Sequence, residues 1–255
     1  LGMVLFLMYL PILLFAVYSF MDSAIIGRSG SFTVKNYVYL FHSEDLRSMI
    51  FGTLILAVVV AVISTILGTL GAIGAFYSSK KLKRPIHLMN QIPVVNADVV
   101  TGFSICVLLI GFFKMDKASY IPLVIGLISL CSPFVYLSVI PRLKQMDPQL
   151  YEAALDLGCS PFGALRKVVL PQLTSGIVSG FMMSITLTLD DYFITTYTKP
   201  SMFDTISTYV VNATKGAQTD VKTALWALST IIFLIVIFVV IGMNHTGRKE
   251  NDHEI

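Results

Sequence analysis

Three carboxylates stand in otherwise apolar parts of the sequence, at Asp98, Asp190 and Asp191. A charge at the centre of a bilayer costs at least about 2.5–3.5 kcal/mol on insertion scales, so such residues usually face a partner or a water-filled cavity. Carboxylates and the π faces of aromatic rings would help a cation to cross a region of low dielectric. We therefore predict a pathway lined by these carboxylates and by Tyr192 and Tyr197.

Each of these assignments has a structural alternative. Asp98 would serve equally well as the cap of a helix that begins there. Asp190 and Asp191 would instead form a structural bond to a lysine or to a broken backbone. Adjacent residues point about 100° apart on a helix, so at most one of the two aims squarely at a central pathway. Trp226 is a further aromatic candidate, but tryptophan commonly marks a membrane interface, and we favour that interpretation.

The side chains that do chemistry in enzymes form no recognisable constellation in this sequence. A G-x-x-x-x-G-K-[ST] phosphate loop is absent, so the chain cannot bind and hydrolyse ATP in the P-loop manner. The H-E-x-x-H and G-x-S-x-G motifs of metalloproteases and serine hydrolases are absent too. The histidines are scattered and no two cysteines form a C-x-x-C pair, so we expect no metal site and no disulfide framework. The sequence predicts a conduit, not an enzyme, whose energy comes from a partner.

The composition is that of a polytopic membrane protein. Of the 255 residues, 55% are hydrophobic and only 13% are charged, whereas about a quarter of the residues of a soluble domain are charged. The mean hydropathy is +0.79. The net charge of +3 is spread over the polar segments and gives no sign of nucleic-acid binding. Leu1 is not an initiator methionine, so we expect the natural chain to begin upstream.

The apolar residues are gathered in runs of the length that crosses the hydrocarbon core, which takes about 20 residues of helix. We predict one all-α domain over residues 1–255, with six transmembrane helices at residues 2–20, 51–77, 98–113, 121–140, 176–198 and 223–243. We expect a polar connection at 21–50, a mixed segment at Pro85–Ala97 and a bend near Ser132-Pro133 in the fourth span. Small residues are predicted to be packing notches between helices, namely Gly68, Gly71, Ala72, Gly74 and Ala75 in the second span and Gly176 and Gly180 in the fifth.

The orientation in the membrane follows from one dense basic segment. Lys80-Lys81-Leu82-Lys83-Arg84 marks the cytoplasmic side by the positive-inside rule. Two further crossings then place residues 141–175 on the same side, and both termini also lie in the cytoplasm. The total number of basic residues alone would not decide the orientation, because the inner segments hold ten Lys or Arg residues and the outer segments hold eight.

Residues 147–171 read as two short soluble helices between membrane spans. Asp147 before Pro148 is a helix start, Gly158 suits a left-handed helix end, and Ser160-Pro161 starts a second helix. Glu152 and Asp156 share one face, whereas a small apolar face is expected from Leu150, Ala154 and Leu157. Pro171 is expected to end the second helix.

This segment resembles the EAA loop of the permeases of ABC importers, whose pattern is EAA-x3-G-x9-I-x-L-P. Every anchor is present except that Val168 replaces the isoleucine. The resemblance implies a type I ABC importer permease fold and a cytoplasmic coupling helix pair that docks on a homodimeric ATPase subunit. It assigns that docking to Glu152, Ala153, Ala154, Gly158, Arg166, Leu170 and Pro171, with Lys167 as a further charge. An ordinary amphipathic loop is the structural alternative.

Two further stretches resemble the permeases of spermidine/putrescine importers. They are Ser184–Thr196, which includes Asp190-Asp191, and the run Pro93-Val-Val-Asn-Ala-Asp-Val-Val. The resemblance implies a multi-pass protein of the bacterial cytoplasmic membrane, in contact with lipid. It also implies a second related permease, an extracytoplasmic polyamine-binding protein, and ATP and magnesium bound by the ATPase and not by this chain.

Three other functions stay open. Related permeases carry iron, sulfate-like anions or other small solutes, and they share the EAA loop. An anion would be opposed by unpaired carboxylates in the pathway. A secondary transporter that works alone would use charges within the membrane but has no use for an EAA loop.

Overall fold

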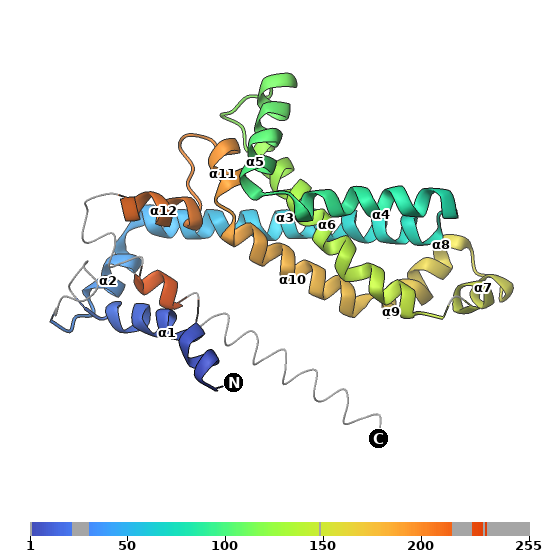
Figure 1. Cartoon of the computed structure of the whole chain (residues 1–255), viewed down its shortest axis with the longest axis horizontal. Helices are drawn as coiled ribbons and strands as arrows, with labels where there is room; N and C mark the ends of the chain where they lie inside the picture. The colour runs from blue at the N-terminus through green and yellow to red at the C-terminus, as the bar shows by residue number, and fades with distance from the viewer. Residues whose placement is uncertain (1, 22–30, 148, 216–225, 232, 234–255) are drawn as a thin grey trace. The chain divides into compact units, whose positions relative to one another are not determined.

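The computed structural model describes residues 2–21, 31–147, 149–215, 226–231 and 233 (Figure 1). Regular structure in these ranges is entirely helical, apart from one isolated β-bridge between Met21 and Phe32. The chain divides into two compact units, residues 1–48 with 209–255 and residues 49–208. One domain over residues 1–255 therefore stays a prediction.

The first unit contains α1 (Gly2–Tyr18), α2 (Lys35–His42) and the start of α3 (Glu44–Tyr77). The side chain of Asn36 on α2 donates hydrogen bonds to the carbonyls of Ser19 and Met21, at 2.8 and 3.0 Å. Asn36 is buried, so these bonds satisfy an amide that would otherwise be costly to remove from water. They fix α2 against the residues that follow α1.

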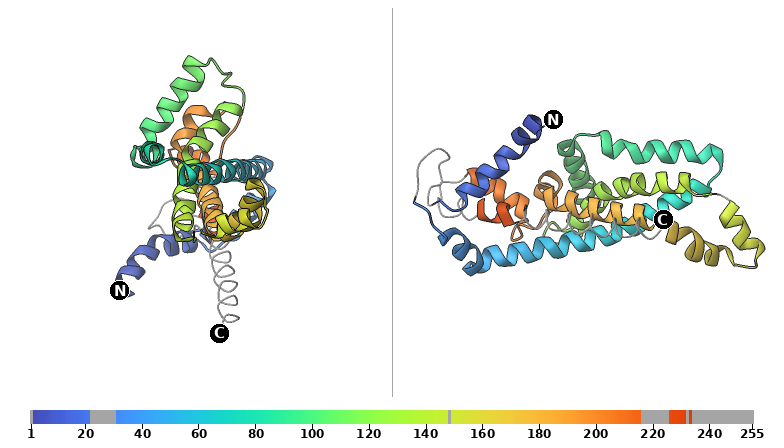
Figure 2. Two further views of the ribbon diagram at one scale, coloured as in Figure 1. Left: turned by 90° about the vertical axis from the view of Figure 1, so that its right-hand side faces the viewer. Right: turned by 90° about the horizontal axis from the view of Figure 1, so that it is seen from below.

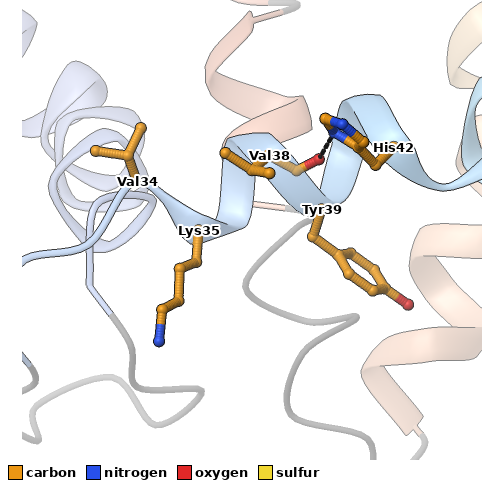
Figure 3. Close-up of a pocket in the computed structure, with 5 residues that line it drawn as sticks. All are labelled: Val34, Lys35, Val38, Tyr39 and His42. Atoms are coloured by element: carbon orange, nitrogen blue, oxygen red, sulfur yellow. Dashed lines mark hydrogen bonds between the residues drawn. The ribbon is translucent and has the colours of Figure 1, made fainter.

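The other side of α2 is exposed and largely apolar (Figure 3). Val34, Lys35, Val38, Tyr39 and His42 line a shallow hollow there, and His42 Nδ1 lies 3.0 Å from the carbonyl oxygen of Val38. The predicted polar connection at 21–50 is therefore partly helical. The second span is also longer than predicted, because α3 begins at Glu44 instead of Phe51.

The second unit is a bundle built around α6 (Ile121–Gln145) (Figures 1 and 2). The helices α4 (Lys80–Val95) and α10 (Thr174–Asp190) both contact α6. One side of α6 contributes Val135, Val139 and Leu143 to a buried cluster, and its first half contributes Leu123 and Leu127 to a second cluster. All five side chains are fully buried, and because lipid is as apolar as they are, close van der Waals packing between the helices holds this part of the unit together in a membrane.

Glycines allow α6 to approach its neighbours closely, as predicted for Gly68, Gly176 and Gly180. A Cβ atom on Gly68 of α3 would lie 2.6 Å from Val135 Cβ, and one on Gly180 of α10 would lie 3.0 Å from Val135 Cγ1. Val135 is thus held between two helices that only the absence of a side chain brings so near. The packing assignment is confirmed for Gly68, Gly176 and Gly180, whereas it is wrong for Gly74, where a Cβ atom would meet no described atom within 4 Å.

The described residues contain two helices long and apolar enough to span a membrane, Leu46–Tyr77 and Ile121–Gln145. Two bent helix pairs raise that number to four if each pair is one span. The fourth predicted span is confirmed as a single helix that continues through Ser132-Pro133. The first corresponds to α1, and the sixth lies mostly outside the described residues.

The third predicted span coincides with the helical segment Asp98–Phe112, but the segment before it differs from the prediction, and so does the fifth span. The segment before the third span is a helix, α4, which includes both Pro85 and Pro93. The basic residues from Lys80 begin this helix instead of forming a loop. A bend of 105° separates Lys81–Val95 from Asp98–Phe112. The latter segment consists of α5 (Asp98–Cys106) and the π-helix η1 (Val107–Phe112).

The predicted continuous fifth span at 176–198 is wrong. The helix α10 stops at Asp190, and a separate helix, α11 (Phe193–Thr198), follows after Asp191 and Tyr192. Asp191 has an extended backbone, with φ −65° and ψ 122°, so the helical hydrogen bonding cannot continue through it. The next section of chain returns to α3, where the backbone N–H of Ile206 donates to Thr53 Oγ1 at 3.2 Å.

Candidate functional site

The segment 147–171 forms the predicted helix pair at the end of the second unit that lies away from α5 and α11 (Figures 1 and 2). The helix α7 (Gln149–Asp156) starts where the carboxylate of Asp147 accepts a hydrogen bond from the N–H of Gln149, at 2.9 Å. The ring of Tyr151 packs at a tilt of 45° against the ring of Tyr77 of α3, with ring centroids 4.9 Å apart. Ala154 is buried on the same side, so one face of α7 is fixed to the bundle.

Gly158 ends α7 in the left-handed conformation that the sequence predicts, with φ +87°. The N–H of Gly158 donates to the carbonyl of Leu155, and the N–H of Cys159 donates to the carbonyl of Ala154. Ser160 then caps α8 (Pro161–Ala164), because its hydroxyl accepts from the N–H of Gly163 at 3.2 Å. Both helix ends of the turn are therefore satisfied by local hydrogen bonds.

The outward side of the helix pair carries both charged and apolar side chains. Glu152, Ala153 and Asp156 are exposed, as are Arg166 and Lys167. The expected small apolar face does not close on the bundle: only Ala154 is buried, whereas Leu157 is 87% exposed. Phe162 beside it is 74% exposed. Large apolar side chains exposed in a polar turn are typical of a surface that contacts another protein.

Pro171 does not end the second helix, which runs on to Gln172 before it bends. The helix changes to a π-helix, η2 (Leu165–Val169), and then to α9 (Leu170–Gln172). Proline has no N–H and crowds the preceding turn, and a wider π turn just before it relieves that conflict. A 71° bend then separates Pro161–Gln172 from Thr174–Asp190. Leu170 is partly buried and Pro171 is exposed.

The second candidate region is the break between α10 and α11, where the two adjacent carboxylates differ. Asp190 is exposed, and its carboxylate has no hydrogen bond or ion pair with any described residue. Asp191 is 9% exposed and is fully engaged. Its Oδ2 accepts from the N–H and from the hydroxyl of Thr195, each at 2.7 Å, and its Oδ1 accepts from the N–H of Ile194 at 3.4 Å.

Asp98 lies beside this break. It occupies the first turn of α5, directly after the bend at Asn96 and Ala97, and it is near enough to Asp191 for the two carboxylates to interact electrostatically. Its side chain caps no described N–H group, because the N-cap position is taken by Ala97. A carboxylate in the first turn is nevertheless favoured by the helix dipole. Because α5 contacts α11, Asp98 lies on a helix adjacent to the break that follows Asp190.

The helices that follow the two breaks, α5 and α11, contact each other directly. Gly102 makes this possible, since a Cβ atom there would lie 3.1 Å from both the N and the Cα atoms of Ile194. Cys106 Sγ lies 3.4 Å from the carbonyl oxygen of Tyr197, and the ring of Tyr197 meets that of Phe103 edge-on at 5.9 Å. Tyr192 is partly buried against Phe193.

The nearest basic residue on the same segment, Lys199, does not pair with Asp190 or Asp191. Its Nζ lies 2.9 Å from Asp204 Oδ1 and donates to the carbonyl of Phe203 at 2.7 Å. One structural alternative, a bond from the Asp pair to this lysine, is therefore wrong. The other, a bond to a broken backbone, is what Asp191 makes.

Trp226 is the remaining candidate from the sequence, and the structure adds residues that sequence reasoning did not find. Trp226 contacts Tyr18 edge-on within the first unit, at 5.7 Å. The described residues contain no group of three or more metal-binding side chains. Sequence reasoning missed Thr195, although an Asp just before a helix commonly accepts hydrogen bonds from N–H groups of the first turn. It also missed Phe162 and Gly102, for which no local pattern exists.

Comparison with known proteins assigns the family. Residues 65–247 match the family described as "Binding-protein-dependent transport system inner membrane component". The chain is 29% identical to the spermidine/putrescine transport system permease protein PotC of Escherichia coli K12, over 95% of this chain and 90% of the relative. It is 26% identical to the putrescine transport system permease protein PotI of the same organism, over 88% of this chain and 81% of that protein.

Among solved structures, a bacterial ABC transporter that imports the acidic polysaccharide alginate has the same fold. Its matching chain superposes with a TM-score of 0.72 at 17% identity, over 96% of this chain and 92% of the other. The fold is that of a type I ABC importer permease. Because the family match covers well over half of the sequence, the chain belongs to the inner membrane components of binding-protein-dependent transport systems.

Proposed function

We propose that this permease forms half of the translocation pathway of an ATP-driven importer of polyamines. The observation that carries the proposal is the similarity to polyamine permeases along nearly the whole chain. The free carboxylates of Asp98 and Asp190 support it, because spermidine and putrescine are protonated amines at neutral pH and opposite charges attract.

The importer has four kinds of component. A second, related permease completes the pathway, a homodimeric ATPase binds ATP and magnesium, and an extracytoplasmic binding protein delivers the polyamine. This chain holds no cofactor of its own. It lies in the bacterial cytoplasmic membrane with both termini in the cytoplasm, an orientation supported by the exposed Lys81, Lys83 and Arg84 at the start of α4.

The helix pair at 147–171 transmits the ATPase motion to the spans. Leu157 and Phe162 offer apolar contact to the ATPase, and Glu152, Arg166 and Lys167 offer charges around it. Tyr151 and Ala154 fix the inner face of α7 to the bundle, so a movement of α7 displaces α3 and α6 as well. Gly158 and Ser160 hold the turn between the two helices in one conformation.

The cargo passes the broken ends of two spans. The C-terminal end of α10 stops at Asp190, and helix C-termini carry partial negative charge that favours cations. In transporters, helix breaks of this kind surround substrate and ion sites. Asp98, Asp190 and the rings of Tyr192 and Tyr197 would line this stretch, with Asp191 beside them.

The neighbour in the alginate importer does not favour an anionic cargo here. At 17% identity it shares the fold, and an anion would meet Asp98 and Asp190 without any described cation to offset them. Ferric iron is also a cation, so iron import is the alternative function that a direct assay must distinguish from polyamine import.

The deciding experiment measures ATP hydrolysis by the complex co-purified from its source membrane, with its binding protein present. Spermidine, putrescine, sulfate and ferric iron are added separately. We expect stimulation by a polyamine alone. Stimulation by another solute would keep the permease and reject the polyamine cargo, and the absence of a co-purifying ATPase would reject the coupling role of residues 147–171.

A further inference from the structure

Two adjacent aspartates at the end of α10 have opposite surroundings. Asp190 is exposed and its carboxylate is free of described partners, whereas Asp191 is buried and both of its oxygens accept hydrogen bonds. The two adjacent aspartates therefore differ in what their carboxylates are able to bind. A carboxylate that already accepts bonds from the backbone has little capacity left for a cargo ammonium group.

The bonds of Asp191 bridge the break itself. Asp191 is the last residue whose N–H bonds back into α10, to Leu187 at 3.0 Å, while its side chain caps α11 through Ile194 and Thr195. The hydroxyl of Thr195 donates to the same Oδ2, so the cap has three donors. Asp191 thus connects the end of one helix to the start of the next.

The far side of the break is anchored in the core. Ile194 and Thr195 are fully buried, and Ile194 packs with Leu123 and Leu127 of α6. On the near side, the carbonyl of Asp190 accepts a hydrogen bond from Ser207 Oγ at 3.1 Å. The backbone at Asp190 is therefore held from both directions, and its carboxylate is left free at a fixed place.

We propose that Asp191 is a positioning residue that fixes the break in the fifth span so that the free carboxylate of Asp190 faces the transported cation. The proposal rests on the proposed function for the identity of the cargo. Asp191 acts through the shape of the break and not by contact with the cargo.

Matched substitutions separate the two roles. Asp191→Asn keeps an acceptor oxygen for the N–H groups of α11 while it removes the charge, and Asp191→Ala removes both. Thr195→Ser keeps the hydroxyl donor, and Thr195→Val removes it at nearly the same volume. Asp190→Asn is the same chemical change one residue earlier, at a carboxylate that has no described partner to lose.

The readout is the ratio of spermidine to putrescine uptake per assembled complex in proteoliposomes, with saturating binding protein. Spermidine carries one ammonium group more than putrescine, so loss of the Asp190 charge lowers this ratio by about threefold, as for one exposed ion pair. We expect Asp191→Ala and Thr195→Val to lower the ratio in the same direction. Asp191→Asn and Thr195→Ser are expected to retain the wild-type ratio.

Asp190→Asn added to Asp191→Ala is expected to lower the ratio no further, because the first change has already misplaced Asp190. The proposal is overturned if Asp191→Asn lowers the ratio as much as Asp190→Asn, since the charge of Asp191 would then act on the cargo. It is also overturned if Thr195→Val leaves the ratio unchanged or if Asp191→Ala changes only the amount of complex.

Failure of the proposed function has a different signature. If the wild-type complex transports neither polyamine, the polyamine cargo is rejected, and the thermal stability of the purified complex then decides the bonding role of Asp191. Asp191→Ala and Thr195→Val should each lower the melting temperature relative to Asp191→Asn and Thr195→Ser. Equal melting temperatures within both pairs would overturn the proposal in that case.

Discussion

The turn at Gly158 and the break at Asp191 are both interruptions between two capped helices, but they differ in what surrounds them. At the turn, Leu157 and Phe162 are exposed, so the surface is incomplete without a partner. At the break, Asp191, Ile194 and Thr195 are buried and their polar groups are bonded to one another. We propose that the same local arrangement serves docking at the turn, whereas at the break it fixes the internal geometry.

The turn and the break differ in the kind of side chain that has no described partner. The turn has satisfied backbone groups and exposed apolar side chains, which are typical of a surface that contacts another protein. The break has a packed interior, and beside it the carboxylates of Asp98 and Asp190 have no hydrogen bond to any described residue. If this contrast is right, changes at the turn should affect the ATPase, and changes at the break should affect the cargo.

The largest expected effect comes from Gly158→Leu. A leucine at φ +87° costs about 1–2 kcal/mol of backbone strain, which would rearrange the turn. We expect uptake to fall by about tenfold, equivalent to about 1.4 kcal/mol of coupling, while the amount of inserted protein is unchanged. Uptake in vesicles and quantitative blotting measure the two. Gly158→Asn is the control, because asparagine tolerates this conformation, and normal uptake in Gly158→Leu would contradict the coupling role.

Leu157→Glu is expected to reduce the ATPase that co-purifies with the permease by several-fold. Its side chain is 87% exposed, so the substitution leaves the stability of the permease itself unchanged. Burial of a leucine contributes about 1.5–3 kcal/mol, and a charge in that position would forfeit this contribution. Leu157→Met keeps the apolar contact and serves as the control. Undiminished ATPase recovery with Leu157→Glu would show that this side chain lies outside the interface.

Gly102→Ala tests the break without touching the turn. The new Cβ would lie 3.1 Å from backbone atoms of Ile194, and overpacking of this kind costs about 1–3 kcal/mol. We expect a lower melting temperature and lower uptake, with normal recovery of the ATPase. Gly111→Ala is the matched control, since its nearest neighbour would be 3.8 Å away. A loss of ATPase binding in Gly102→Ala would break the separation between the two regions.

Ser160→Ala is the mildest change at the turn. It removes the acceptor for the N–H of Gly163, and the loss of such a cap costs about 1 kcal/mol. Hydrogen exchange should therefore become faster at the Gly163 amide, by about fivefold, while exchange in α10 is unchanged. Ser160→Thr retains the cap and should retain the protection. Unaltered exchange in Ser160→Ala would mean that the packing of Ala164 alone holds α8.

Residues 147–171 were predictable to the level of single caps, because helix starts and stops depend on local chemistry. Asp147, Gly158 and Ser160 act as their residue types predict. The prediction failed where the outcome depends on distant neighbours. Pro171 does not end its helix, because a π turn absorbs it, and the expected apolar face of α7 is only partly buried.

The sequence by itself determined the helical membrane class, the positions of the second and fourth spans, the turn at Gly158 and the three carboxylates, because length, hydropathy and capping are local properties. Only the tertiary structure decided that the fifth span breaks after Asp190 and that Asp191 is engaged while Asp190 is free. This difference between the two carboxylates depends on the packing of α11 against α5 and α6, at Gly102 and Ile194. Contacts between segments so far apart in the chain leave no local pattern in the sequence.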